Sequence, residues 1–245
     1  LGEKKFSYDS LEDKTGESIS DKNSYYGEYT FHYWVWKNYL DRIDDGWIGF
    51  CQYRKFWAPK KPKPENNSFE EFEKIVLKEL SSEYDKYDSI IGEPFFINQF
   101  RLTKFLKRNL VEMILNPSLI FNSKSRNIKF HFDMFHGEGN LEKAIKLLDD
   151  ENMKGFTDFV ESKGSFNPQN MFICKKDLLK RYYETIFPWL EKCEKVFGFN
   201  NLKGYGLKRI YGFLAERFLS YWFTKHYKVK ELPILVKDLS DYKNL

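Results

Sequence analysis

Residues 47–57, WIGFCQYRKFW, change from apolar to polar and cationic halfway along the segment. The apolar half is typical of a buried strand, because aromatic and β-branched residues in a row need both faces covered, as in a parallel sheet. In open α/β sheets, ligands bind beyond the carboxyl ends of the strands. The segment therefore predicts a substrate-binding strand end made of Gln52, Tyr53, Arg54 and Lys55. The alternative is an edge strand whose basic residues face water.

A second group of charges lies within residues 209–218, RIYGFLAERF, which are otherwise apolar. Arg209 and Glu216 are seven residues apart, two turns on one helix face, and Gly212 between them permits close approach of a ligand or another backbone. Buried charges must be paired or must meet a ligand. Glu216 is therefore either part of a structural ion pair with Arg209 or Arg217, or it acts on a substrate hydroxyl while Arg209 holds an anion.

Residues 131–137, HFDMFHG, carry two imidazoles and a carboxylate, which are good metal ligands. The spacing argues against a metal site. On a helix Asp133 and His136 share a face without His131, and on a strand His131 and Asp133 share a face without His136. Asp133 and His136 remain candidates for substrate contact or general-base work, with a structural role as the alternative.

The composition is that of a solvated globular protein with a large aromatic core. Of the 245 residues 19% are aromatic and 31% are charged, and the mean hydropathy is −0.62. No stretch approaches the roughly 18 apolar residues of a membrane span, and no signal peptide opens the chain. A net charge of +4 does not require a nucleic-acid partner. Cys51, Cys174 and Cys193 lack CxxC spacing, which favours buried thiols in a reducing cytoplasm.

Helices and strands are expected to alternate, as in an α/β fold. Helical periods and caps predict helices at about residues 25–40, 68–82, 99–115, 140–150, 151–163, 176–196 and 207–226. Apolar runs predict strands after residue 46, at 89–92 and at 170–174. Residues 229–236, split by Pro233, are at best an edge strand.

The predicted helix at residues 99–115 is strongly basic on one broad face, formed by Arg101, Lys104, Lys107 and Arg108. Between residues 98 and 130 seven Lys or Arg stand against a single Glu112. This face is either an ordinary solvated surface or a patch that contacts phosphates or the inner face of a membrane.

Five segments, in order, resemble the motifs of a bacterial family of capsular and exopolysaccharide biosynthesis proteins. The family was long described as a domain of unknown function and is regarded as a group of glycosyltransferases. Its motifs NISxKN, ExTxxYWxWKN, IGxxHYRRxF, NMFI and RxxGFxxERL are similar to residues 18–23, 28–38, 48–56, 170–173 and 209–218. Gln52 stands where the family usually has His, so an essential imidazole is not expected at this position.

The resemblance implies a GT-A-like α/β fold: a mixed, mainly parallel sheet flanked by helices, with a helical C-terminal part. Relatives usually begin with a further strand, so a strand upstream of Leu1 is expected to be missing here. We expect one domain over residues 1–245, with the nucleotide-sugar side at 1–97, a helical basic insert at 98–165, and the acceptor side with the C-terminal helices at 166–245.

The resemblance also implies glycosyl transfer from a nucleotide sugar to a growing capsular, exopolysaccharide or lipopolysaccharide glycan. Galactofuranose is among the sugars associated with relatives. Such a protein would be cytoplasmic or peripheral at the inner face of the membrane, with no nucleic-acid partner. Two alternatives are a non-catalytic glycan- or nucleotide-binding component of a polysaccharide assembly complex, and a membrane-surface adaptor that uses the basic patch.

Glycosyl transfer assigns roles to the residues above. The charge of the leaving diphosphate must be met by a metal on a DxD motif or by fixed cations, and the sequence has no DxD. We therefore expect no required cofactor and metal-independent stabilisation by Arg54 and Lys55. The donor-binding candidates are Gln52, Tyr53, Arg54, Lys55, Asn23 and Arg209. The acceptor-binding candidates are Asn170, Trp36 and Tyr33, and the candidates for the base are Glu216 first, then Asp133 and His136.

Overall fold

The centre of the protein is a four-stranded mixed sheet with the strand order β1-β6-β3-β7. The computed structural model describes residues 11–61, 69–97 and 126–238. The four strands are β1 (Trp47–Gly49), β6 (Phe172–Lys175), β3 (Ser89–Gly92) and β7 (Val229–Leu232). Strand β6 pairs antiparallel with β1 and β3, whereas β3 and β7 are parallel. Two small antiparallel sheets join β2 (Lys55–Trp57) to β8 (Ile234–Val236) and β4 (Phe95–Phe96) to β5 (Ser165–Phe166).

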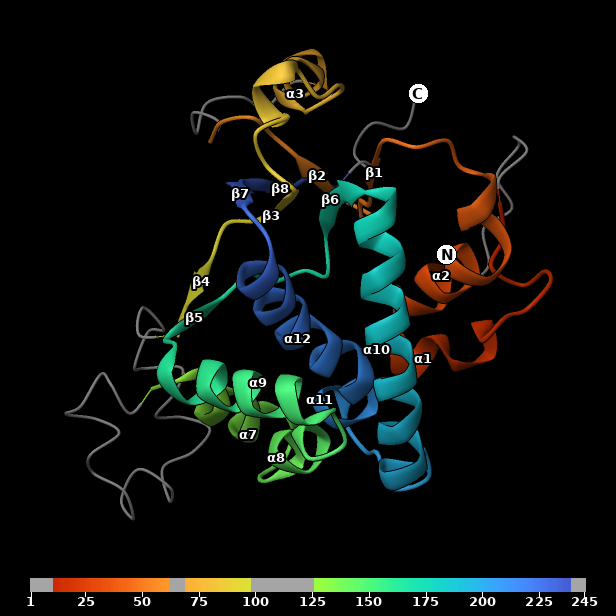
Figure 1. Ribbon diagram of the computed structural model, residues 1–245, viewed down its shortest axis with the longest axis vertical. Coiled ribbons are helices and arrows are strands. Elements are labelled where there is room, and N and C mark those ends of the chain that lie inside the picture. Colours follow the sequence, from red (N-terminus) through yellow and green to blue (C-terminus); the bar gives the residue numbers. More distant parts are fainter. Residues whose placement is uncertain (1–10, 62–68, 98–125, 239–245) are drawn as a thin grey trace.

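The helices form three groups along the chain, and Figure 1 shows α3 at the opposite end of the molecule from α7, α8 and α9. Near the N-terminus lie η1 (Ser20–Lys22), α1 (Asn23–Tyr26), α2 (Tyr29–Trp34), the π-helical η2 (Val35–Tyr39) and η3 (Leu40–Arg42). The middle of the chain forms α3 (Phe69–Ile75), η4 (Ser82–Tyr84), α7 (Ile128–His136), α8 (Asn140–Ile145) and α9 (Asp150–Ser162). The C-terminal part forms α10 (Lys176–Phe197), α11 (Tyr205–Lys208) and α12 (Ile210–His226).

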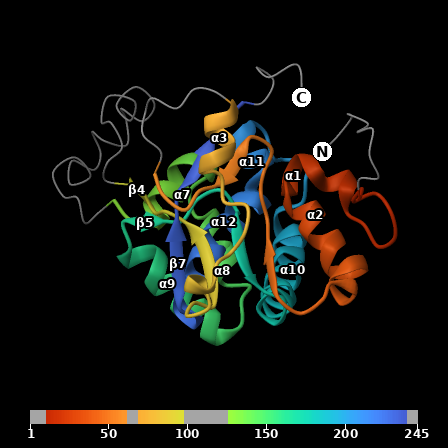
Figure 2. The same ribbon diagram turned by 90° about the horizontal axis from the view of Figure 1, so that it is seen from above.

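Helix α12 is the central helix of the fold. It is apolar on nearly all sides, which is typical of a helix enclosed by other elements. It packs against α10, α1, α7 and α9. Figure 2 shows α1 and α2 on one side of α10, and α9 and β7 on the other. Because α12 touches both helical groups, residues on it can meet side chains from distant parts of the chain.

The sheet is buried on both faces, because successive side chains of its inner strands enter different clusters. In β6, Phe172 and Cys174 face the main core, where the Phe172 ring lies 5.2 Å from that of Phe223 on α12. Ile173 faces a smaller cluster with Trp57 and Ile90. Helix α10 follows β6 directly and therefore covers the main-core face.

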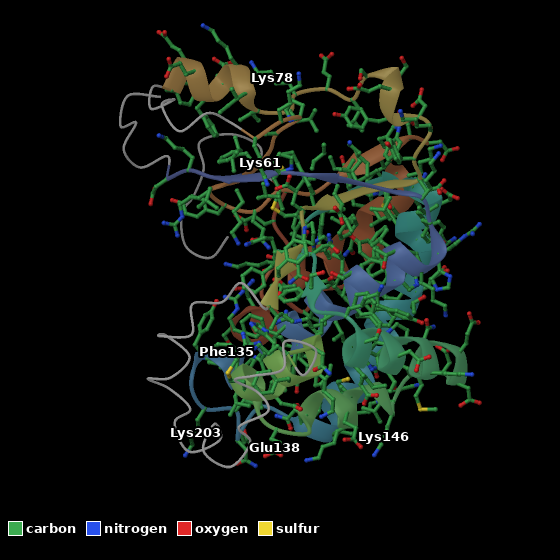
Figure 3. All side chains as sticks on the ribbon, turned by 90° about the vertical axis from the view of Figure 1, so that its left-hand side faces the viewer. Lys61, Lys78, Phe135, Glu138, Lys146 and Lys203 are labelled. Atoms are coloured by element: carbon green, nitrogen blue, oxygen red, sulfur yellow. The ribbon has the colours of Figure 1, made fainter. Side chains whose placement is uncertain are left out.

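The two ends of the molecule carry exposed charges. Figure 3 shows Lys61 and Lys78 at the end that includes α3, and Lys146 and Lys203 at the opposite end beside α7 and α8. Three of these lysines form exposed ion pairs: Lys61 with Glu93, Lys78 with Glu73, and Lys146 with Glu142.

The expected α/β architecture is confirmed, with a mixed sheet flanked by helices and a helical C-terminal part. The strands at 89–92 and 170–174 and the helices at 151–163, 176–196 and 207–226 form close to their predicted positions. Residues 229–236 form β7 and β8, separated by Pro233. The predicted basic helix at 99–115, with Arg101, Lys104, Lys107 and Arg108, lies outside the described residues.

Several local expectations were wrong. The helix expected at 68–82 ends at Ile75 in α3, and the helix expected at 140–150 ends at Ile145 in α8. Strand β1 is not a buried parallel strand: it is an antiparallel edge strand with Gly49 exposed, and among the described strands antiparallel pairs outnumber parallel ones. The helix expected from residue 25 is interrupted at Gly27, whose φ of 62° ends α1. Cys51 is exposed, whereas Cys174 and Cys193 are buried as expected.

Candidate active site

Glu28 is the centre of a cluster of polar side chains from four distant segments. Its Oε1 accepts hydrogen bonds from Gln52 Nε2 at 2.5 Å and from Asn170 Nδ2 at 2.9 Å. Its Oε2 lies 3.5 Å from Nη2 of Arg209. We call Glu28, Gln52, Lys55, Asn170, Arg209 and Glu216 the Glu28 cluster. It gathers both negative and positive charges at one place.

Two glycines allow the N-terminal segment to approach α12 at this point. A Cβ on Gly27 would collide with the Arg209 guanidinium, and its positive φ is unfavourable for other residues. On α12, a Cβ on Gly212 would come within 3.1 Å of the Tyr26 carbonyl oxygen. The chain can therefore turn at Gly27 and present Glu28 to Arg209.

The turn before β6 links the two carboxylates of the cluster. Gln169 and Asn170 have φ values of 90° and 50°, which are uncommon for residues other than glycine. In this conformation the Gln169 N–H donates to Oε1 of Glu216 at 2.7 Å, and the Gln169 carbonyl accepts from Gln52 Nε2. Asn170 Nδ2 also donates to the Gly212 carbonyl at 3.1 Å. The strained turn thus fixes the positions of both glutamates.

The segment after β1 is a tight turn that brings Lys55 back to Gln52. The Lys55 N–H donates to the Gln52 carbonyl at 3.0 Å, and Lys55 Nζ donates to Gln52 Oε1 at 2.5 Å. Arg54, at the tip of the turn, has a φ of 66°. The Gln52 amide therefore connects the Lys55 ammonium to the Glu28 carboxylate.

Burial changes the proton affinities of the groups in this cluster. It raises the pKa of Glu28, an effect that Asn170 and Arg209 partly oppose. It also lowers the pKa of Lys55, while Glu28 and Glu216 act in the opposite direction. The cluster can therefore hold a carboxylate of enhanced basicity next to two partly exposed cations, Lys55 and Arg209.

Arg217 lies in the protein interior next to the Glu28 cluster and binds Glu216. Its side chain is 2% exposed, and its Nη1 donates to Oε2 of Glu216. Its Nη2 donates to Nδ1 of His131 at 3.3 Å, and its guanidinium lies 3.7 Å from the centre of the Phe166 ring. The ion pair of Glu216 with Arg217, one of the two interpretations of this helix, is thus present.

The structure brings together five of the residues predicted from the sequence: Gln52, Lys55, Asn170, Arg209 and Glu216. Asn23 lies nearby, where its Nδ2 donates to the Gly27 carbonyl at 3.0 Å and supports the turn before Glu28. Arg54 forms an exposed pair with Asp238 at 2.8 Å and stacks on Tyr53, whose side chain is largely exposed. Tyr53 and Arg54 thus occupy the rim of the turn.

Asp133 and His136 lie on α7 and have other partners. Asp133 pairs with Lys129 at 2.8 Å, and His136 Nδ1 is 3.0 Å from the Gly206 carbonyl oxygen. Burial lowers the pKa of His136 to about 3, so its ring is neutral. Among the described residues no group of three or more His, Cys, Asp or Glu side chains could hold a metal ion.

Tyr33 and Trp36 lie against α10. The Trp36 ring stacks on Phe187 at 5.3 Å, and the Tyr33 hydroxyl donates to Glu17 at 2.6 Å. Neither makes a hydrogen bond to the Glu28 cluster among the residues that the structure describes. Their proposed contact with an acceptor stays a prediction.

Glu28 is the residue that the sequence-based site lacked, although it opens the segment 28–38. Four of the five family-like segments each contribute to the Glu28 cluster, and the fifth contributes Asn23 beside it. Its position directly after Gly27 marks Glu28 as a charged residue beside an aromatic helix, but the sequence does not show the direction of its side chain.

Comparisons with known proteins agree with this architecture. The model of a family described as "Domain of unknown function (DUF4422)" matches residues 2–227. Among solved structures, the apo form of the WbbM bifunctional glycosyltransferase is similar, with a TM-score of 0.69 and 24% identity. The similarity covers 92% of this chain and 39% of that one, so this chain spans less than half of its length. No curated protein matches in sequence. Because the family model covers nearly the whole chain, this protein belongs to the DUF4422 family.

Proposed function

We propose that the protein is a glycosyltransferase, which moves a sugar from a nucleoside-diphosphate donor to a growing glycan. The observation that carries the proposal is the Glu28 cluster itself. It places two carboxylates, Glu28 and Glu216, beside two partly exposed cations, Lys55 and Arg209. Support comes from the similarity of the fold to a solved glycosyltransferase.

The cations provide the first requirement of glycosyl transfer. When the bond between the sugar and the diphosphate breaks, negative charge develops on the phosphate oxygens. Lys55 and Arg209 can stabilise this charge through charge-assisted hydrogen bonds, with Arg54 at the rim of the same turn. We propose that this stabilisation needs no metal ion, since fixed cations stand at the turn after β1.

The carboxylates provide the second requirement, a group that takes the proton of the acceptor hydroxyl. Glu216 is the candidate predicted from the sequence, and Glu28 is the second carboxylate of the same cluster. The amide of Asn170 lies between Glu28 and α12, where it can also meet a sugar hydroxyl. Donor and acceptor would then meet at one face of the cluster.

The finer assignments follow from the sequence resemblance. We propose galactofuranose as a sugar to test first, and a capsular, exopolysaccharide or lipopolysaccharide glycan as the acceptor. Among the described residues no helix is long and apolar enough to cross a membrane. Contact with the inner face of a membrane would use the basic residues around 101–108, and a cytoplasmic location is part of the same proposal.

The test is transfer by the purified chain. UDP-sugars, UDP-galactofuranose among them, are incubated with glycan acceptors, and products are detected by mass spectrometry. We expect transfer that survives EDTA. Loss of activity in EDTA with recovery in manganese would contradict the metal-independent mechanism. Binding of a UDP-sugar without hydrolysis or transfer, across varied acceptors, would favour a non-catalytic component of an assembly complex.

Variants of the cations test the donor site by calorimetry with UDP and the UDP-sugar. Arg209→Ala and Lys55→Ala should each weaken binding by on the order of 1.5–3 kcal/mol, the value of a charge-assisted hydrogen bond. Arg54→Ala should weaken binding less, because Arg54 is exposed and paired with Asp238. The control is Lys146→Ala, which removes an exposed lysine at the opposite end of the molecule (Figure 3). Equal affinities for all four variants would contradict the donor site.

A further inference from the structure

The two carboxylates of the Glu28 cluster differ in how far their oxygens are already engaged. Both oxygens of Glu216 are occupied, Oε1 by the Gln169 N–H and Oε2 by Arg217. Its side chain is 14% exposed, against 29% for Glu28. Protonation of Glu216 would leave the Arg217 charge buried without its counter-ion. Glu216 is thus poorly suited to take a proton during catalysis.

Glu28 has one oxygen that is fixed and one that is open. The hydrogen bonds to Glu28 among the described residues both end on Oε1, donated by Gln52 and Asn170. Oε2 lies 3.5 Å from Nη2 of Arg209, which is too long for a strong hydrogen bond, and no side-chain donor among the described residues is bonded to it. The two amides hold the carboxylate in one orientation and leave the lone pairs of Oε2 for another donor.

Asn170 adds an observation that points to a ligand at this place. The residue is only 5% exposed, and its Oδ1 has no hydrogen-bond partner among the residues that the structure describes. Because Nδ2 already donates to Glu28 and to the Gly212 carbonyl, turning the amide over would not supply a donor to Oδ1. A buried acceptor without a partner is unfavourable, and a hydroxyl that enters the cluster would satisfy it.

We propose that Glu28 is the catalytic base, which accepts the proton of the acceptor hydroxyl at Oε2, and that Glu216 is a positioning residue for the Gln169 turn. This inference rests on the proposed function. The acceptor oxygen forms a bond to the anomeric carbon, and its proton passes to Glu28. The electron pair of the bond between the anomeric carbon and the phosphate leaves with the nucleoside diphosphate. In this proposal the base lies on the side of the sugar opposite the leaving group, and such a displacement inverts the anomeric configuration.

Arg209 links donor binding to the strength of this base. As it lies beside Oε2, Arg209 favours the ionised form of Glu28 and so reduces its affinity for a proton. A diphosphate bound to Arg209 offsets that charge, and the proton affinity of Glu28 rises. Burial already raises the pKa of Glu28, so its basicity moves toward the range useful near neutral pH. Glu28 becomes a stronger base once the leaving group is in place.

The test compares Glu28→Gln with Glu28→Asp and Glu216→Gln. We expect Glu28→Gln to lower kcat by roughly 10²- to 10⁴-fold, the usual contribution of a general base. Its affinity for UDP should be equal or higher, because the variant lacks the negative charge beside Arg209. The wild-type kcat should rise with pH on an acid limb, which Glu28→Gln abolishes and Glu28→Asp retains at reduced rate. Glu216→Gln should chiefly lower the midpoint of unfolding. The matched control is Glu12→Gln, which changes an exposed glutamate outside the cluster.

The outcomes separate this inference from the proposed function. If the wild-type chain transfers no sugar, the proposed function fails and this inference fails with it. If the wild-type chain is active and Glu28→Gln keeps both its kcat and its acid limb, only the assignment of Glu28 is overturned. A product with retained anomeric configuration would overturn it as well. If Glu28→Gln does not fold, Glu28→Asp provides the test. A folded Glu28→Asp enzyme whose kcat and acid limb equal those of the wild type would overturn the assignment.

Discussion

The adjacent residues Glu28 and Tyr29 belong to two different polar clusters, which differ in charge and in exposure to solvent. The Glu28 cluster contains carboxylates, cations and amides and is partly open to solvent. The second, which we call the His32 cluster, consists of Tyr29, His32, Tyr182 and Tyr183, each at most 3% exposed. The hydroxyls of Tyr29 and Tyr182 are 2.6 Å apart, and His32 Nδ1 lies 2.8 Å from the Tyr183 hydroxyl. This cluster is neutral and enclosed by aromatic rings.

The difference shows how the same aromatic interior serves two purposes. In the His32 cluster short neutral hydrogen bonds satisfy the polar atoms, which is the normal condition for buried groups. Among the described residues, buried side-chain atoms without a partner include Asn170 Oδ1 and Arg217 Nε, in or beside the Glu28 cluster. A cluster that is neutral and paired stabilises the fold, whereas one that is charged and incompletely paired is suited to a ligand.

The largest expected effect on stability comes from Arg217, which supports the Glu28 cluster from inside. Arg217→Met should lower the free energy of unfolding by about 3–5 kcal/mol, because Glu216 and His131 would lose a buried partner. Urea unfolding followed by tryptophan fluorescence measures this loss. Such a loss would show that the buried ion pair between Glu216 and Arg217 stabilises the fold as well as holding Glu216 in the Glu28 cluster.

The matched control is Arg181→Met on α10. Arg181 is 63% exposed and lies 4.0 Å from Asp177, so its removal should change stability little. Equal losses for Arg181→Met and Arg217→Met would show that Arg217 does not stabilise Glu216, and the distinction between supporting and exposed charges would fail.

The pH dependence of stability should distinguish the two clusters by sign. Burial lowers the pKa of His32 to about 3, below the 6.5 of an ordinary histidine. The unfolded chain therefore binds a proton that the folded chain does not, and stability is lost as the pH falls from about 6.5 toward 3. At pH 5 the loss from His32 is about 2 kcal/mol relative to pH 8. Glu28 acts oppositely: with its pKa raised, its contribution to stability is lost as the pH rises through that pKa.

Urea unfolding at a series of pH values checks this expectation. Between pH 6.5 and 5 the free energy of unfolding should fall less steeply in His32→Gln. The difference in slope should correspond to close to one fewer proton taken up on unfolding. His226→Gln is the control, because His226 is exposed and burial lowers its pKa less strongly. A slope that His32→Gln leaves unchanged would mean that His32 is protonated in the folded protein, and the His32 cluster could not be described as neutral.

The sequence located much of the Glu28 cluster because polar residues stood out beside apolar runs. Gln52, Asn170 and Glu216 were found in this way. The strand direction behind that reasoning was wrong, since pairing partners are set by the whole fold and an apolar run looks alike in parallel and antiparallel sheets. Gln52 still reaches Glu28, because the turn after β1 folds back instead of extending beyond a parallel strand.

Glu28 could not be placed from its own surroundings. Helical periodicity predicted one helix across residues 25–40, which hides the turn at Gly27 that sets the direction of Glu28. The positive φ angles of Gln169 and Asn170 were equally hidden, since neither residue type demands that conformation. Both features depend on long-range contacts with α12, which local patterns do not record.

The smallest effect, and the most direct comparison, comes from Tyr29, the neighbour of Glu28. Tyr29→Phe removes a buried hydroxyl and its hydrogen bond to Tyr182, so the free energy of unfolding should fall by about 1–3 kcal/mol, toward the lower end if Tyr182 finds another partner. The kcat should stay unchanged, because Tyr29 faces the core. Tyr25→Phe is the control, since Tyr25 is partly exposed and packs on Phe199 through its ring. A fall in kcat as large as that of Glu28→Gln would join the two clusters into one functional unit, because the enclosed hydrogen bonds would then set the geometry of the carboxylate next to them.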